Sequence, residues 1–331
     1  MKKNEKVTKK TLRTFDMFCG GGGSSRGAVM AGAEPVAAVD RWDLATETYK
    51  LNFPEAVTYR MKTASLTPRR VLDDVGDIDL LMASPECTSH SVAKGNKPRC
   101  ENSRATAFEV IRFAKVLKPR WIVVENVIQM KRWHRFREWI GKLHSLGYKT
   151  KSTTLDAQRH KTPQSRRRLF IVGELEAEPC IPKPQPRKVI TVSQVLGRGE
   201  SKSKPWRYSS LNSPSRATAT IERAERAFET LGRDVPFIMV YYGTDGAGGF
   251  QSLDRPLRTV TTLDRFAYVR PNGSGHEMRM LQPPELAAAM GFPSDHVWAS
   301  SSRRDRIKLI GNAVCPPVMR DAVKALVGQR T

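Results

Sequence analysis

Short apolar segments alternate with amphipathic segments from Thr11 to about Gly173, and this alternation constrains the fold more than any other feature. Parallel strands need long crossover connections, and amphipathic helices provide them. The pattern therefore predicts an α/β fold with a doubly wound, mostly parallel sheet. We expect strands over residues 13–18, 35–39, 78–83, 121–124 and 169–172, and helices over residues 24–33, 44–52, 104–117 and 130–146.

The texture of the sequence changes at Pro179, where prolines and the basic run 198–204 interrupt any regular pattern. Such composition favours an irregular, surface-exposed region, and 331 residues suffice for a large domain and a smaller one. We expect five ranges: a basic tail (1–10), a first domain (11–178), a smaller irregular domain (179–278), a hinge (279–302) and a C-terminal segment returning to the first domain (303–331).

The charge balance is strongly basic, with 56 Lys and Arg against 33 Asp and Glu and a formal net charge of +23. Long-range attraction and counterion release then favour a polyanionic partner, most commonly nucleic acid. The alternative is a protein that merely tolerates its evenly spread charge.

The five cysteines are too scattered for a zinc cluster, and their odd number does not fit a disulfide framework. We expect no metal and a reducing cytoplasmic location. No apolar stretch resembles a signal peptide or reaches membrane-spanning length, so no membrane association is expected.

Two strand ends carry candidate catalytic groups. Cys87 lies in the loop after the strand 78–83, and Glu125 follows the strand 121–124. Parallel sheets place their chemistry at the carboxyl edge of the strands, so the pattern predicts a nucleophile with an acid partner. His90 suggests a cysteine–histidine dyad as an alternative, but no hydrolase context accompanies it.

A glycine-rich loop, Cys19 to Gly27, joins the first strand to a helix. Dinucleotide spacing fails because Ser25 and Arg26 occupy the positions of the third glycine, and no Gly-Lys-Ser/Thr follows for a phosphate loop. The remaining interpretation is a ligand with an adenosine end, with Asp40 bonded to the ribose. A flexible turn with a helix-capping aspartate is the alternative.

Taken in order, these motifs resemble those of the DNA cytosine carbon-5 methyltransferases of bacterial or phage type, which use S-adenosylmethionine. The series comprises the Phe18 glycine loop, Asp40, Pro85-Glu86-Cys87, Glu125-Asn126-Val127, Gln164 to Arg168, Arg279-Met280-Leu281, Met290 to Pro293 and Gly311 to Val314.

The resemblance implies a role for each matching residue. Cys87 matches the nucleophile that adds to cytosine carbon-6, and Glu125 matches the group that serves ring nitrogen-3. Arg166 and Arg168 match the pair that holds the base oxygen and the DNA backbone, with Gln164 ahead of them. The cofactor positions implied are Phe18 against adenine, Gly20 and Gly23 through their backbone, Asp40 on ribose, and Asn312 with Val314 closing the site.

The resemblance also implies base flipping of cytosine from double-stranded DNA, target recognition by residues 179–278, and a monomer from a restriction–modification system. Open alternatives are methylation of RNA such as tRNA, an inactive DNA-binding relative, and an oxidoreductase on a similar sheet.

Two departures from the family pattern stand out. Glu86 replaces the usual proline before the nucleophile, and a carboxylate facing the sulfur would raise the pKa of the thiol. We therefore predict that Glu86 points away or pairs with a basic residue. In the family an acidic residue usually follows the third strand, near the adenine amino group. In this sequence the corresponding region reads Arg60 to Thr63, so the acidic residue has no match and we expect a backbone contact to the cofactor.

Overall fold

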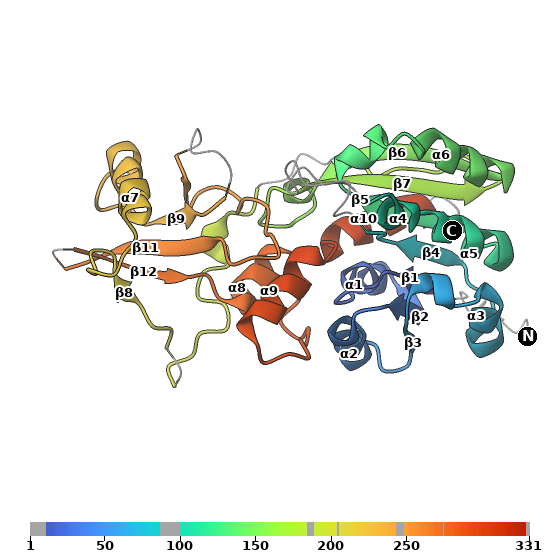
Figure 1. The fold of residues 1–331 in the computed structure, drawn as a ribbon, viewed down its shortest axis with the longest axis horizontal. Helices are drawn as coiled ribbons and strands as arrows, with labels where there is room; N and C mark the ends of the chain where they lie inside the picture. The colour runs from blue at the N-terminus through green and yellow to red at the C-terminus, as the bar shows by residue number, and fades with distance from the viewer. Residues whose placement is uncertain are drawn as a thin grey trace, which may run out of the picture. The chain divides into compact units, whose positions relative to one another are not determined.

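A computed structural model describes residues 11–86, 100–183, 189–203, 205–242, 248–273 and 275–328. The chain divides into two compact units (Figure 1). Unit 1 comprises residues 1–154, 168–183 and 319–331, and unit 2 comprises residues 155–167 and 184–318. Residues 155–167 and 303–318 thus group with unit 2. Within this unit Gln164 pairs with Leu257 and bonds Val260, and Arg166 bonds Gly311.

The large sheet has seven strands in the order β3-β2-β1-β4-β5-β7-β6. The first five positions are parallel, and β7 runs antiparallel to β5, which confirms the predicted mostly parallel sheet. The bounds are β1 Leu12–Met17, β2 Ala33–Asp40, β3 Val57–Arg60, β4 Leu80–Ala83, β5 Trp121–Asn126, β6 Tyr148–Asp156 and β7 Arg167–Leu175.

Helices cover both faces of this sheet. Successive residues of β2 point to opposite faces, so their contacts show which helices lie on each face. Val39 packs in the cluster that contains residues of α3 and α5, whereas Ala38 packs with Tyr49 and Phe53 near α2. The helices here are α1 Gly23–Met30, α2 Asp43–Asn52, α3 Pro68–Val75, α4 Glu101–Ala105, α5 Phe108–Leu117, α6 Phe136–Ser145 and α10 Pro316–Val327, whose last residues belong to unit 1.

Unit 2 contains a five-stranded sheet in the order β10-β9-β11-β12-β8, with all four pairings antiparallel. The expectation of irregular structure is thus wrong for much of this range, since short strands and the helix α7 form between connections that contain most of the prolines and the basic run. The bounds are β8 Ser209–Ser210, α7 Thr218–Leu231, β9 Phe237–Val240, β10 Phe250–Ser252, β11 Phe266–Asn272, β12 Gly275–Met280, α8 Pro283–Ala289 and α9 Arg303–Asn312.

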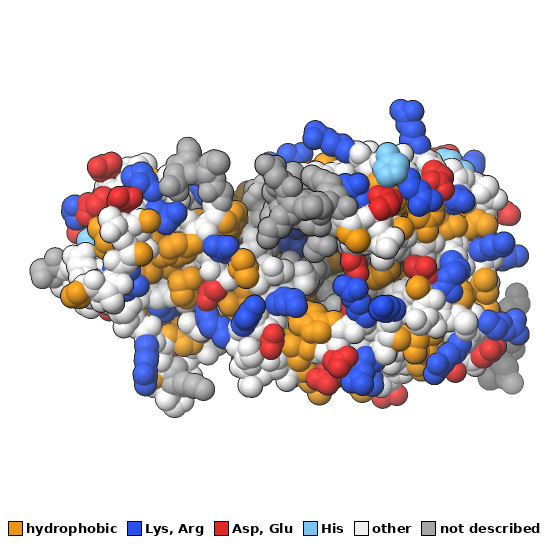
Figure 2. Space-filling model, in the orientation of Figure 1, with side chains coloured by type: hydrophobic (Ala, Val, Ile, Leu, Met, Phe, Trp, Pro, Cys, Tyr) orange, Lys and Arg blue, Asp and Glu red, His pale blue; other side chains and the backbone are white. Residues whose placement is uncertain are grey.

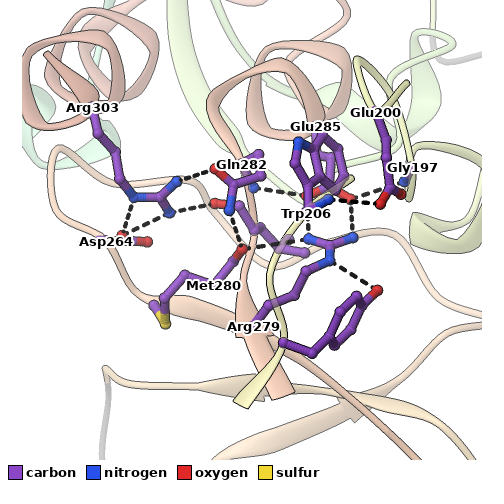
Figure 3. A network of polar contacts seen from close by, with 11 residues as sticks. Gly197, Glu200, Trp206, Asp264, Arg279, Met280, Gln282, Glu285 and Arg303 are labelled. Atoms are coloured by element: carbon purple, nitrogen blue, oxygen red, sulfur yellow. Dashed lines mark hydrogen bonds and ion pairs between the residues drawn. The ribbon is translucent and has the colours of Figure 1, made fainter. Parts of the chain in front are cut away.

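A buried ion pair joins the end of β12 to α8 (Figure 3). Arg279 contacts both oxygens of Glu285 at 2.8 Å, and both side chains are almost completely buried. Glu285 also accepts hydrogen bonds from the backbone N–H of Gln282 and of Gly197, and Arg279 donates to the hydroxyl of Tyr208. These partners satisfy charges that would otherwise destabilise the fold.

Candidate active site

The chain just before Cys87 is held at the carboxyl edge of the large sheet. The Ser84 N–H donates to the Met17 carbonyl at the end of β1, and the Asn126 side chain at the end of β5 donates to the Pro85 carbonyl at 3.0 Å. Cys87 itself and His90 lie outside the described residues. The structure therefore positions the approach to Cys87 between the ends of β1 and β5.

Glu86, the last described residue before Cys87, has two partners. Its Oε1 lies 3.1 Å from Nη2 of Arg41, and its Oε2 accepts a 2.8 Å hydrogen bond from the Ser103 hydroxyl. The prediction that this carboxylate pairs with a basic residue is confirmed.

Glu125 and Arg168 come together from the antiparallel neighbours β5 and β7. The Arg168 Nε lies 3.4 Å from Glu125 Oε1, and the carboxylate side chain is only 10% exposed. An ion pair at this depth is less screened by solvent than a surface pair, so Arg168 holds the Glu125 side chain in place at the end of β5.

Arg166 lies in a different environment, inside unit 2. Its Nη1 donates to the Val260 carbonyl, and its Nη2 donates to the carbonyls of Gly311 and Ala313, all between 2.9 and 3.2 Å. The side chain is 5% exposed. In this structure Arg166 therefore joins the end of α9 to the segment around Val260.

Gln164 makes a second connection in unit 2. Its Oε1 accepts from the Val260 N–H at 2.8 Å, while its Nε2 donates to the Ala289 carbonyl and to the Met290 sulfur. Gln164 and Arg166 together hold residues that are distant in sequence. Composition alone carries no signal for these long-range bonds.

Asn312 and Val314 lie at the end of α9, with Asn312 exposed and Val314 buried. The preceding Gly311 packs directly on backbone, because a Cβ there would lie 2.2 Å from the carbonyl oxygen of Thr261. Asn312 and Val314, which we expect to close the cofactor site, thus follow a residue whose backbone is closely packed.

The glycine loop turns sharply through residues with positive φ. Phe18 has φ 59°, an uncommon conformation for a non-glycine residue, and Gly20 and Gly22 have φ 51° and 82°. A Cβ on Gly20 would meet no atom of the described residues within 4 Å, whereas one on Gly22 would lie 2.7 Å from the Phe53 ring. Gly22 is therefore required for packing, and the described part of the chain leaves open space at Gly20. Gly23 begins α1 and is buried.

Asp40 closes this loop from the end of β2. Its Oδ2 accepts from the Gly20 N–H and its Oδ1 from the Trp42 N–H, both at 2.9 Å. Burial raises the pKa of Asp40 above its usual value, and these hydrogen bonds oppose the rise. A carboxylate has about four lone-pair sites, so Asp40 retains capacity for further donors.

Asp16 is a buried acid that our sequence analysis did not single out. It is fully buried at the end of β1, its Oδ2 accepts from the Ser25 hydroxyl, and that hydroxyl contacts the Tyr49 hydroxyl at 2.7 Å. Its Oδ1 has no hydrogen-bond partner in the described part of the chain. Burial raises the pKa of Asp16 from 3.8 to about 7, against a lowering by hydrogen bonds from Ser25. The sequence signal that could have identified Asp16 is an acidic residue inside an apolar strand.

We predict that Asp16→Asn makes stability less dependent on pH. The folded-state pKa lies above that of the unfolded chain, so the native state holds the proton between about pH 4 and 7 and loses stability as pH rises through this window. Relative to Asp16→Asn, the wild type should lose roughly 2 kcal/mol of unfolding free energy between about pH 5 and pH 7. Urea denaturation at a series of pH values measures this, with the exposed Asp73→Asn as control. Parallel curves for the wild type and Asp16→Asn would contradict it.

The segment after β3 contains no acidic side chain. The Arg60 guanidinium lies 3.5 Å from Asp43 on α2, and the Met61 N–H donates to the Asp40 carbonyl. The backbone here is therefore held against the end of β2.

The described residues offer neither a metal site nor a membrane span. They contain no group of three or more His, Cys, Asp or Glu placed to bind a metal ion, and none of their helices has the length and the apolar composition that a membrane-spanning segment needs.

The matches to known proteins extend over nearly the whole chain. The family model for C-5 cytosine-specific DNA methylase matches residues 12–328. Type II methyltransferase M.HindV of Haemophilus influenzae is 26% identical over 323 residues, which cover 96% of each chain. Type II methyltransferase M.HgiDI of Herpetosiphon aurantiacus is 25% identical, with 92% of this chain and 90% of that protein covered. The solved structure of Entamoeba histolytica methyltransferase EhMeth shares the fold, with a TM-score of 0.69 at 17% identity over 98% of this chain and 100% of that one.

Proposed function

The chain belongs to the family of C-5 cytosine-specific DNA methylases, and on this basis we propose that it methylates cytosine at specific sites in duplex DNA through a covalent bond to Cys87. One observation carries the assignment of the site. The Asn126 side chain, next to Glu125, bonds the Pro85 carbonyl, so the residues that lead into Cys87 and the strand end that carries Glu125 lie at one edge of the sheet.

The glycine loop fits S-adenosylmethionine as the methyl donor. Open space at Gly20 and the remaining lone pairs of Asp40 suit a nucleoside without a pyrophosphate. We assign Phe18 to the adenine, Gly20 and Gly23 to the close backbone approach and Asp40 to the ribose, with Asn312 and Val314 completing the site. When bound, this cofactor supplies an electrophilic methyl group.

The residues of the chain make cytosine reactive toward that methyl group. The Cys87 thiolate bonds to carbon-6, which moves an electron pair toward carbon-5 and negative charge toward nitrogen-3. Glu125 in its acid form protonates nitrogen-3, and Arg168 stabilises the resulting carboxylate. After methyl transfer, the carbon-5 proton passes to solvent, its bonding electrons restore the carbon-5–carbon-6 double bond, and the carbon-6–sulfur bond breaks to release the Cys87 thiolate. Nitrogen-3 returns its proton to Glu125, which restores the ring and the acid.

The charge of the chain suits a DNA substrate. The formal net charge of +23 favours attraction to the phosphates of DNA. Figure 2 shows Lys and Arg side chains spread over the visible face among acidic ones. We assign target recognition to residues 179–278 and infer that the cytosine leaves the duplex to react. By analogy with the type II relatives, we propose a cytoplasmic monomer within a restriction–modification system.

Labelled cofactor tests the substrate directly. We expect label in duplex DNA and none in tRNA, and a stable protein adduct on duplex DNA containing 5-fluorocytosine. Label found only in tRNA would favour the RNA alternative. DNA binding without label or adduct would identify an inactive binding relative.

Glu125→Gln tests the acid role. The amide keeps the size of the side chain but cannot give nitrogen-3 a proton, so the maximal rate should fall roughly 100- to 1,000-fold while DNA affinity changes little. Single-turnover transfer at saturating cofactor measures the rate. Glu138→Gln, on the exposed surface of α6, is the control. An unchanged rate in Glu125→Gln would assign Glu125 to structure alone.

A further inference from the structure

Glu86 stands at the base of the segment that carries Cys87, and its two partners come from different parts of unit 1. Arg41 directly follows Asp40 at the end of β2, and Ser103 lies in α4, where the chain returns after that segment. The Glu86 carboxylate therefore connects the chain just before Cys87 to Ser103 and to Arg41, which lies on the cofactor side of the sheet. The resemblance to the methyltransferase family assigns no role to Glu86 or to these two contacts.

We propose that Glu86 is a positioning residue, which holds both ends of the Cys87 segment together and ties them to Arg41 beside the cofactor loop. The inference rests on the proposed role of Cys87. Neither Glu86 nor Arg41 needs to touch the substrate for this role. The effect passes through the backbone, since Glu86 is joined directly to Cys87.

The charge of the pair matters as much as its geometry. A lone carboxylate one residue from the nucleophile opposes formation of the thiolate, and Arg41 compensates that charge at 3.1 Å. Arg41 also interacts electrostatically with Asp40. Removing Arg41 alone should therefore be worse than removing Glu86 alone.

The pair contributes little to overall stability. The Arg41 side chain is 63% exposed and Glu86 is 26% exposed, and ion pairs this exposed have small effects on unfolding. A loss of rate with unchanged stability would therefore separate positioning from a general structural role.

Rates of adduct formation on duplex DNA containing 5-fluorocytosine, at saturating cofactor, test the proposal. Glu86→Ala should slow the maximal rate roughly 10- to 100-fold with DNA affinity and the urea midpoint unchanged, because small misplacements of a reacting group are costly. Glu86→Gln, which keeps a partner for Ser103, should retain part of the rate that Glu86→Ala loses. Arg41→Lys should retain most of the wild-type rate.

The double variant gives the sharpest result. Arg41→Ala should be slower than Glu86→Ala, and adding Glu86→Ala to it should raise the rate to the level of Glu86→Ala alone. Arg69→Ala, which breaks the exposed Arg69–Asp73 pair on α3, should leave the rate unchanged. A wild-type rate for Glu86→Ala, or losses that simply add, would overturn the proposal. Absence of any adduct in the wild type would instead overturn the proposed function.

Discussion

Cys87→Ser is expected to lower methyl transfer at least about 1,000-fold, the largest catalytic effect in this chain. A serine hydroxyl ionises far less readily than a thiol, so the bond to carbon-6 does not form at neutral pH. Single-turnover transfer from labelled cofactor to duplex DNA measures the loss, and the 5-fluorocytosine adduct should disappear with it. DNA affinity should remain, because the charges that attract phosphates are unchanged.

Cys180→Ser is the matched control, since Cys180 is a partly exposed cysteine after β7 and belongs to none of the motifs. It should retain wild-type transfer. Substantial transfer by Cys87→Ser together with a persistent adduct would mean that another residue is the nucleophile.

Gly311→Ala is expected to destabilise unit 2 by about 3 kcal/mol or more. The added Cβ would lie 2.2 Å from the Thr261 oxygen and 2.4 Å from its carbonyl carbon, and backbone cannot move aside as a flexible side chain does. The same shift would disturb the Gly311 and Ala313 carbonyls that Arg166 binds. Chemical denaturation followed by a probe in unit 2 measures the change.

Gly141→Ala provides the matching control in α6, where a Cβ would meet nothing within 4 Å. There the helix should gain roughly 0.5–1 kcal/mol, because alanine is the better helix former. If Gly311→Ala unfolds at the same denaturant concentration as the wild type, α9 does not pack on residues 260–262 as described.

The expected helices were mostly found, with local breaks. The helix over 104–117 is two helices, α4 and α5, separated near Thr106, and the range 130–146 starts as a 3-10 turn before α6. Two strands escaped prediction. β3 is short and β6 is largely polar, and both lie at the edges of the sheet, where no continuous apolar run is required. The strands of unit 2 were not predicted for a related reason, because the prolines in and around them interrupt the pattern that indicates a strand.

The sequence alone determined the parallel sheet and the order of the motifs at its carboxyl edge, because buried strands require apolar runs and reactive groups follow them directly. Only the tertiary structure decided what several of these residues contact. Arg166 binds carbonyls 94 to 147 residues away, Glu86 binds Arg41 and Ser103, and Asp16 is buried beside Ser25. Such partners follow from how distant segments pack, and no local pattern of residues encodes that packing.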